Sequence, residues 1–77
     1  MNRTMLLTDL DQAKARVVVG EQDIALQKDL IGELILEGLV TRAKGESEFL
    51  RALELTQALY VTHRDFLEKE LATTKAA

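Results

Sequence analysis

The chain has 77 residues, enough for one domain, and its net charge of −3 comes from 13 acidic and 10 basic side chains. The absence of cysteine excludes disulfides and thiolate metal sites. The charges are scattered, so the sequence lacks the basic patch on which nucleic-acid binding depends. No apolar run approaches the roughly 18 residues of a membrane-spanning helix. We therefore expect a soluble cytoplasmic protein that binds neither nucleic acid nor a membrane.

A first helix is predicted over about 9–37, after a flexible lead-in at residues 1–8. The Thr8 hydroxyl can accept a hydrogen bond from a free N–H group at the helix start, and Asp9 favours the positive end of the helix dipole. Gly38 suits the left-handed position that follows a helix end.

A second helix is predicted over about 46–72, after a connector at 38–45. Glu46 and Glu48 would lie in its first turn, where acidic side chains are favourable. Thr41 is a rival cap for an earlier start. Residues 73–77 are expected to fray.

Apolar residues of the first helix follow a heptad repeat, which is typical of a helix packed along a partner helix. Its a positions are Leu10, Val17, Ile24, Ile31 and Gly38, and its d positions are Ala13, Gly20, Gln27 and Leu34. At 100° per residue, Leu10, Ala13, Val17, Ile24, Ile31 and Ile35 fall in one stripe, and Val19, Leu26, Leu30 and Leu34 form a second stripe beside it. The two stripes together cover an arc of roughly 200°, where one core requires only about 100°. This helix is therefore expected to contact more than one neighbour.

The second helix has a similar pattern. Leu53, Tyr60 and Leu67 recur every seven residues, accompanied by Phe49, Thr56, His63 and Leu71, with a flanking stripe of Leu55, Leu59 and Phe66. Two long helices with a short connector predict an all-α, antiparallel two-helix hairpin. The flanking stripes would remain exposed on a single hairpin, so we expect a homodimer that forms a four-helix bundle.

The predicted connector also sets the register of the hairpin. If the chain reverses near residue 43, facing residues have numbers that add up to roughly 87 by simple reflection about the connector. The expected pairs are Leu34 with Leu53, Ile31 with Thr56, Gln27 with Tyr60, Ile24 with His63, and Gly20 with Leu67. The predicted packing and interface residues are Val17, Gly20, Ile24, Gln27, Leu30, Ile31, Leu34, Leu53, Thr56, Leu59, Tyr60, His63, Phe66 and Leu67.

The segment His63-Arg64-Asp65 is the only part of the sequence that resembles a reactive site. Consecutive helical residues point in different directions, so these three cannot converge on one substrate atom. We expect no catalytic, metal-binding or cofactor-binding residue.

A buried polar layer of Gln27, Thr56, Tyr60 and His63 is predicted, in which Gln27 hydrogen-bonds to Tyr60 or to the second copy. Such a layer could fix the register or line a small-molecule pocket.

Two stretches resemble a group of small uncharacterised helical proteins of alphaproteobacteria. Val18-Val19-Gly20-Glu21, with Ile24 and Gln27, is similar to their V-x-x-G-E-x-x-I-x-x-Q pattern, whose valine corresponds to Val17. Leu55 to Tyr60, with Arg64, Asp65 and Leu67, is similar to their E-T-x-A-L-H-x-x-x-R-D-x-L pattern. This chain departs from the second pattern at two positions, where Leu55 replaces the acidic residue and Tyr60 replaces the histidine. The connector of this chain is also about two residues longer than that of the group. The resemblance implies a helical hairpin with no known activity.

The functional prediction is a self-associating protein–protein interaction module rather than an enzyme. A small DNA-associated regulator is the alternative, although the missing basic patch argues against it. A ligand-binding helical bundle that uses the polar layer around His63 is a third possibility.

Overall fold

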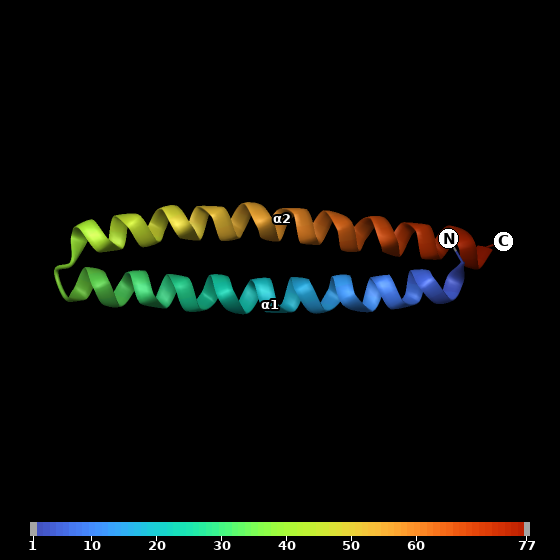
Figure 1. Ribbon diagram of the computed structural model, residues 1–77, viewed down its shortest axis with the longest axis horizontal. Coiled ribbons are helices and arrows are strands. Elements are labelled where there is room, and N and C mark those ends of the chain that lie inside the picture. Colours follow the sequence, from blue (N-terminus) through green and yellow to red (C-terminus); the bar gives the residue numbers. More distant parts are fainter. Residues whose placement is uncertain (1, 77) are drawn as a thin grey trace.

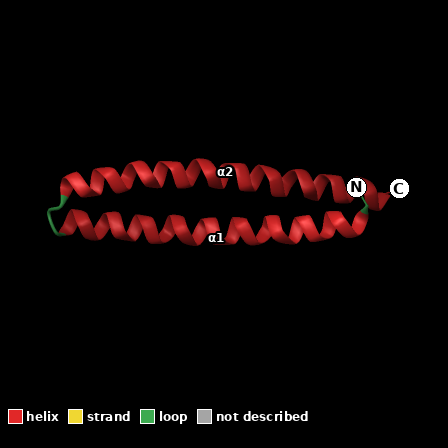
Figure 2. Cartoon of the chain, in the orientation of Figure 1, coloured by secondary structure: helices red, strands yellow, loops and turns green. Residues whose placement is uncertain are grey.

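The computed structural model describes residues 2–76, and the side chains of residues 2–74. It contains two long α-helices that lie side by side and run antiparallel (Figure 1). Helix α1 spans Arg3–Leu36 and helix α2 spans Val40–Ala76. The hairpin is 59 Å long and 14 Å in each other direction, and one short turn joins the helices (Figure 2). The predicted all-α antiparallel hairpin is confirmed.

Helix α1 begins earlier than the sequence analysis predicted. Asn2 is its N-cap, and the Asn2 side chain accepts a hydrogen bond from the Met5 N–H at 2.8 Å. This bond satisfies one of the free N–H groups at the helix start. Thr8 instead lies inside the helix, where its hydroxyl donates to the Thr4 carbonyl at 3.1 Å. The predicted flexible lead-in is therefore wrong over residues 3–8, while Met1 lies outside the described residues.

The turn between the helices is a Schellman motif. Gly38 has φ +78°, a left-handed conformation that strains residues with a Cβ atom. The Leu39 N–H donates to the Leu34 carbonyl at 2.9 Å, and the Gly38 N–H donates to the Ile35 carbonyl at 3.0 Å. These bonds satisfy carbonyls at the end of α1. The left-handed role predicted for Gly38 is confirmed.

Because this motif reverses the chain within three residues, the predicted connector at 38–45 is too long. Helix α2 begins at Val40, and the Ala43 N–H already donates to the Leu39 carbonyl at 2.9 Å. Neither Thr41 nor Glu46 marks its start, and Gly45 lies within the helix. The helix also continues past residue 72 to Ala76, so the predicted end of the helix at about residue 72 is wrong, while fraying of the last turn stays a prediction. Ala77 lies outside the described residues.

The residues through which the two helices contact each other follow a heptad repeat in both α1 and α2. We call this contact between the two helices the seam. Its α1 side consists of Leu6, Leu10, Ala13, Val17, Gly20, Ile24, Gln27, Ile31 and Leu34. The α2 side consists of Ala43, Glu46, Leu50, Leu53, Gln57, Tyr60, Arg64, Leu67, Leu71 and Thr74. All of these residues are buried or half-buried. The alternating spacing of three and four residues keeps each set on one side of its helix.

The register differs from the predicted one. Gly20 lies against Gln57, and the Gln27 side chain bonds to Glu46. Residues at the same level therefore have numbers that add up to between 73 and 77, rather than to 87. The difference follows from the short turn, which centres the reversal on Gly38 instead of residue 43.

The best-buried apolar cluster lies near the two termini. It contains Leu6, Leu10, Ala13 and Leu67, and Leu71 packs against it. Leu6 is only 3% exposed and Leu67 only 2%. This cluster explains why the first turns of α1 are ordered, since Leu6 anchors them to α2.

Candidate interaction surface

Glutamine side chains of the seam form hydrogen bonds between the two helices at two levels. At the first, Gln27 is 8% exposed, and its Nε2 donates to the Glu46 carbonyl at 2.9 Å and to the Glu46 carboxylate at 2.6 Å. A buried amide without a partner would be costly, so Glu46 makes Gln27 compatible with the seam. The predicted hydrogen bond from Gln27 to Tyr60 is therefore wrong, while the alternative bond from Gln27 to a second copy stays a prediction.

The second polar level joins Gln57 to α1. The Gln57 Nε2 donates to the Val17 carbonyl at 2.9 Å. The Oε1 of the same amide lies over Gly20 so closely that a Cβ atom on Gly20 would collide with it. Gly20 thus provides the space in which the Gln57 amide reaches the backbone of α1. The predicted contact of Gly20 with Leu67 is wrong.

The structure separates the predicted packing residues into two groups. Nine lie in the seam: Val17, Gly20, Ile24, Gln27, Ile31, Leu34, Leu53, Tyr60 and Leu67. Leu30 is half-buried beside it, and Thr56, Leu59, His63 and Phe66 are exposed. The predicted polar layer does not form within the hairpin, because Thr56 and His63 lie outside the seam.

Several seam residues of α2 were not predicted from the sequence. These are Ala43, Glu46, Leu50, Gln57, Arg64 and Thr74. Their signal in the sequence is the unbroken spacing of three and four residues from Ala43 to Thr74. Arg64 fits at the seam margin because its guanidinium turns toward the Asp65 carboxylate, 3.0 Å away.

The two sides of the hairpin that flank the seam differ in polarity. With the seam at heptad positions a and d, positions c and g lie on one side and b and e on the other. We call the c and g side the lateral face. Its central part consists of Arg16, Val19, Asp23, Leu26 and Leu30 from α1, and Phe49, Ala52, Thr56, Leu59, His63 and Phe66 from α2.

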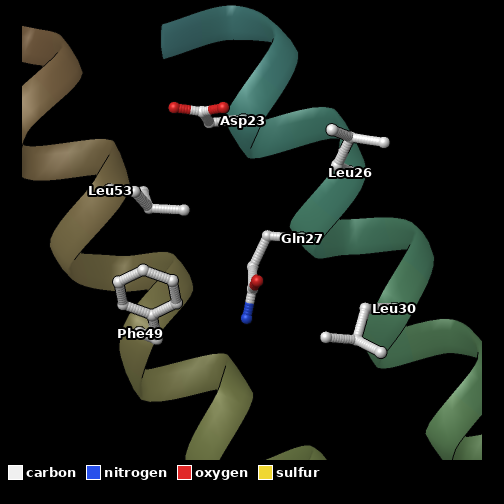
Figure 3. Close-up of a pocket in the computed structure, with 6 residues that line it drawn as sticks. All are labelled: Asp23, Leu26, Gln27, Leu30, Phe49 and Leu53. Atoms are coloured by element: carbon white, nitrogen blue, oxygen red, sulfur yellow. The ribbon is translucent and has the colours of Figure 1, made fainter.

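Large apolar side chains are exposed on this lateral face. Leu26 is 68% exposed, Leu59 is 70% exposed and Phe66 is 57% exposed. A shallow groove on the face is lined by Asp23, Leu26, Gln27, Leu30, Phe49 and Leu53. In Figure 3, Leu26, Gln27 and Leu30 project from α1 and Phe49 and Leu53 from α2 around this groove. The groove shows that the apolar residues of both helices share one side of the hairpin.

The opposite side is charged. Its b and e positions carry Lys14, Glu21, Lys28, Lys44, Arg51, Glu54, Asp65 and Glu68, together with the exposed apolar residues Leu7, Val18 and Ile35. A groove on this side is lined entirely by polar and charged residues, Lys44, Ser47, Glu48 and Arg51. The lateral face therefore exposes more large apolar side chains than the opposite flank, and it is the only one of the two with exposed phenylalanines among the described residues.

Other kinds of site find little support among the described residues. No group of three or more histidine, cysteine, aspartate or glutamate side chains is arranged to hold a metal ion within that part of the chain. Neither described helix has a stretch both long and apolar enough to cross a membrane. His63 is exposed on the lateral face, while its neighbours Arg64 and Asp65 pair with each other.

No family model, curated protein or solved structure matches the chain. The resemblance to the alphaproteobacterial group stays a prediction. The asymmetry between the two flanks of the hairpin is the feature on which a functional interpretation can be based.

Proposed function

We propose that the protein is a self-associating protein–protein interaction module whose lateral face is buried in a homodimer. The observation that carries this proposal is the concentration of exposed Leu26, Phe49, Leu59 and Phe66 on one flank, opposite a charged flank. Scattered exposed apolar residues are common on monomers, whereas a contiguous patch marks an interaction surface.

The energetic gain from covering the face is considerable. Full burial of a leucine or phenylalanine side chain is worth about 1.5–3 kcal/mol. More than half of each of Leu26, Phe49, Leu59 and Phe66 is exposed, so each contributes about 1 kcal/mol or more on association. A two-helix hairpin buries few residues for its length, and a four-helix bundle adds a second apolar contact to each helix.

The size of the face also suits a dimer. A hairpin flank 59 Å long and 14 Å wide offers about 800 Å² if it is covered along its whole length, which is what each partner contributes to a standard interface.

The test compares two lysine substitutions at neighbouring positions. Leu59→Lys puts a charge on the lateral face, and Ala58→Lys puts the same charge at the same level on the charged flank. Both residues are exposed in α2, so both variants should keep the hairpin fold. Sedimentation equilibrium should show that Leu59→Lys raises the dimer dissociation constant at least about tenfold, a change of about 1.4 kcal/mol. Ala58→Lys should leave the constant unchanged, and equal effects of the two substitutions would contradict the proposal.

A further inference from the structure

We propose that the second copy packs on the lateral face in an antiparallel orientation, about a two-fold axis that crosses the helices at the level of Val19 and Thr56. This inference rests on the proposed function and adds a specific geometry to it. In this arrangement each α1 lies on the other α1 and each α2 on the other α2, because the axis runs across the hairpin.

The charges on the lateral face of α1 are arranged symmetrically about one level of the helix. Arg16 and Asp23 both occupy g positions on the lateral face and lie symmetrically about Val19 and Gly20. A two-fold axis at that level brings Arg16 of one copy opposite Asp23 of the other, twice in the dimer. Among the described side chains, neither residue forms an ion pair within the hairpin. Both charges are therefore available for an intermolecular pair.

Charges on α2 indicate an axis at the same level. Arg42 and Glu70 also occupy g positions and lie symmetrically about Thr56. Gly20 contacts Gln57, so the centre of the α1 pair and the centre of the α2 pair lie at the same level of the hairpin. Two charge pairs on different helices thus indicate a single axis.

Side-chain sizes along α2 agree with this axis. Leu59 and Ala52 are c positions at nearly equal distances from Thr56, and so are Phe66 and Gly45. The axis therefore places Leu59 and Phe66 of one copy over the small residues Ala52 and Gly45 of the other. Such alternation of large and small residues allows helices to interdigitate.

The parallel alternative, with an axis along the hairpin, fits the charges less well. It places α1 of one copy on α2 of the other with their levels unchanged. Arg42 would then lie near Glu33 and Glu37, but Arg16 would lie near Leu59 and His63 without an acidic partner, and Asp9 would lie near Glu70. Like charges opposed across an interface are unfavourable, so the antiparallel orientation is preferred.

Charge reversal tests the register of the dimer. Arg16→Asp alone and Asp23→Arg alone should each raise the dissociation constant about tenfold, since each creates like-charge contacts twice by symmetry. The double variant Arg16→Asp/Asp23→Arg should return to within about threefold of the original constant. Lys14 and Glu21 have the same spacing on the charged flank, so Lys14→Glu provides a control that should have no effect.

Cysteine cross-linking tests the orientation, and the chain has no cysteine of its own. A disulfide requires Cβ atoms about 3.5–4.5 Å apart, which residues meeting at the two-fold axis can satisfy. Thr56→Cys alone should form a disulfide-linked dimer under mild oxidation, and Ala58→Cys on the charged flank should not.

The possible results separate the orientation from the proposed function. A dimer with charge rescue and a Thr56→Cys cross-link supports the antiparallel geometry. A dimer without rescue, in which only a mixture of Val19→Cys and Thr56→Cys proteins cross-links, overturns this geometry in favour of the parallel one and leaves the proposed function in place. If the unaltered protein stays monomeric, both the antiparallel geometry and the proposed function are wrong.

Discussion

Replacing Gly20 by alanine tests the close contact between the helices. A Cβ atom at this position would collide with Oε1 of Gln57, the end of a flexible side chain, whereas nothing lies within 4 Å of a Cβ atom built on Gly32. In Gly20→Ala we therefore expect the Gln57 amide to swing away and to lose its 2.9 Å hydrogen bond to the Val17 carbonyl. Gly32→Ala should leave every neighbour in place.

The magnitudes follow from two opposing effects. Alanine is more favourable than glycine inside a helix by about 1 kcal/mol, and a hydrogen bond contributes about 0.5–1.5 kcal/mol. The free energy of unfolding should therefore rise by about 1 kcal/mol in Gly32→Ala. In Gly20→Ala the more favourable helix propensity of alanine and the lost hydrogen bond of Gln57 have opposite effects of similar size, so the free energy of unfolding should change little. Once Gln57→Ala has removed the amide, Gly20→Ala should recover the full gain of about 1 kcal/mol.

The assay is denaturant unfolding of the four variants of a double-mutant cycle, at one protein concentration because association contributes to stability. The expected coupling energy between positions 20 and 57 is about 1 kcal/mol. If Gly20→Ala stabilises as much as Gly32→Ala in the original background, with no coupling to Gln57, the register described here is wrong.

Three further substitutions test other parts of the hairpin. Gly38→Ala should lower the free energy of unfolding by about 1–2 kcal/mol, because φ is +78° at this position; the same substitution at Gly32 has the opposite sign, so equal effects in thermal unfolding would contradict the Schellman turn. Leu6→Ala should cost about 2–5 kcal/mol, since this side chain is 3% exposed, and a cost below 0.5 kcal/mol in urea unfolding would indicate a loose N-terminus. Leu36→Ala, at an 89% exposed position, should change stability by less than about 0.5 kcal/mol, and a larger loss would show that Leu36 is covered.

The sequence was sufficient to predict the seam of α1 but not that of α2. In α2, Leu53, Tyr60 and Leu67 belong to two possible heptad frames. One frame adds Phe49, Thr56 and His63, and the other adds Leu50, Gln57 and Arg64. Side-chain polarity favours the first, because it avoids a buried glutamine and arginine. The structure adopts the second, in which Gln57 bonds to Val17 and Arg64 pairs with Asp65. The bond from Gln57 to Val17 joins the two helices and depends on their register, which polarity alone does not encode.

The length of the turn was the other feature that could not be predicted. Gly45 suggested a helix boundary, yet a glycine inside a helix costs only about 1 kcal/mol, and packing of the long helix offsets it. The start of α1 had a clear signal in Asn2, a favourable N-cap residue, but Thr8 and Asp9 gave a similar signal later. Burial of Leu6 decides between them, and burial depends on the partner helix.

The mass of the unaltered protein in solution tests the central claim most directly. Light scattering after size-exclusion chromatography at micromolar concentration should give about 17 kDa, twice the chain mass of 8.6 kDa, and the mass should decrease on dilution. A uniform, cooperatively folded particle of 8.6 kDa at every concentration would contradict the claim that the lateral face is buried against a second copy.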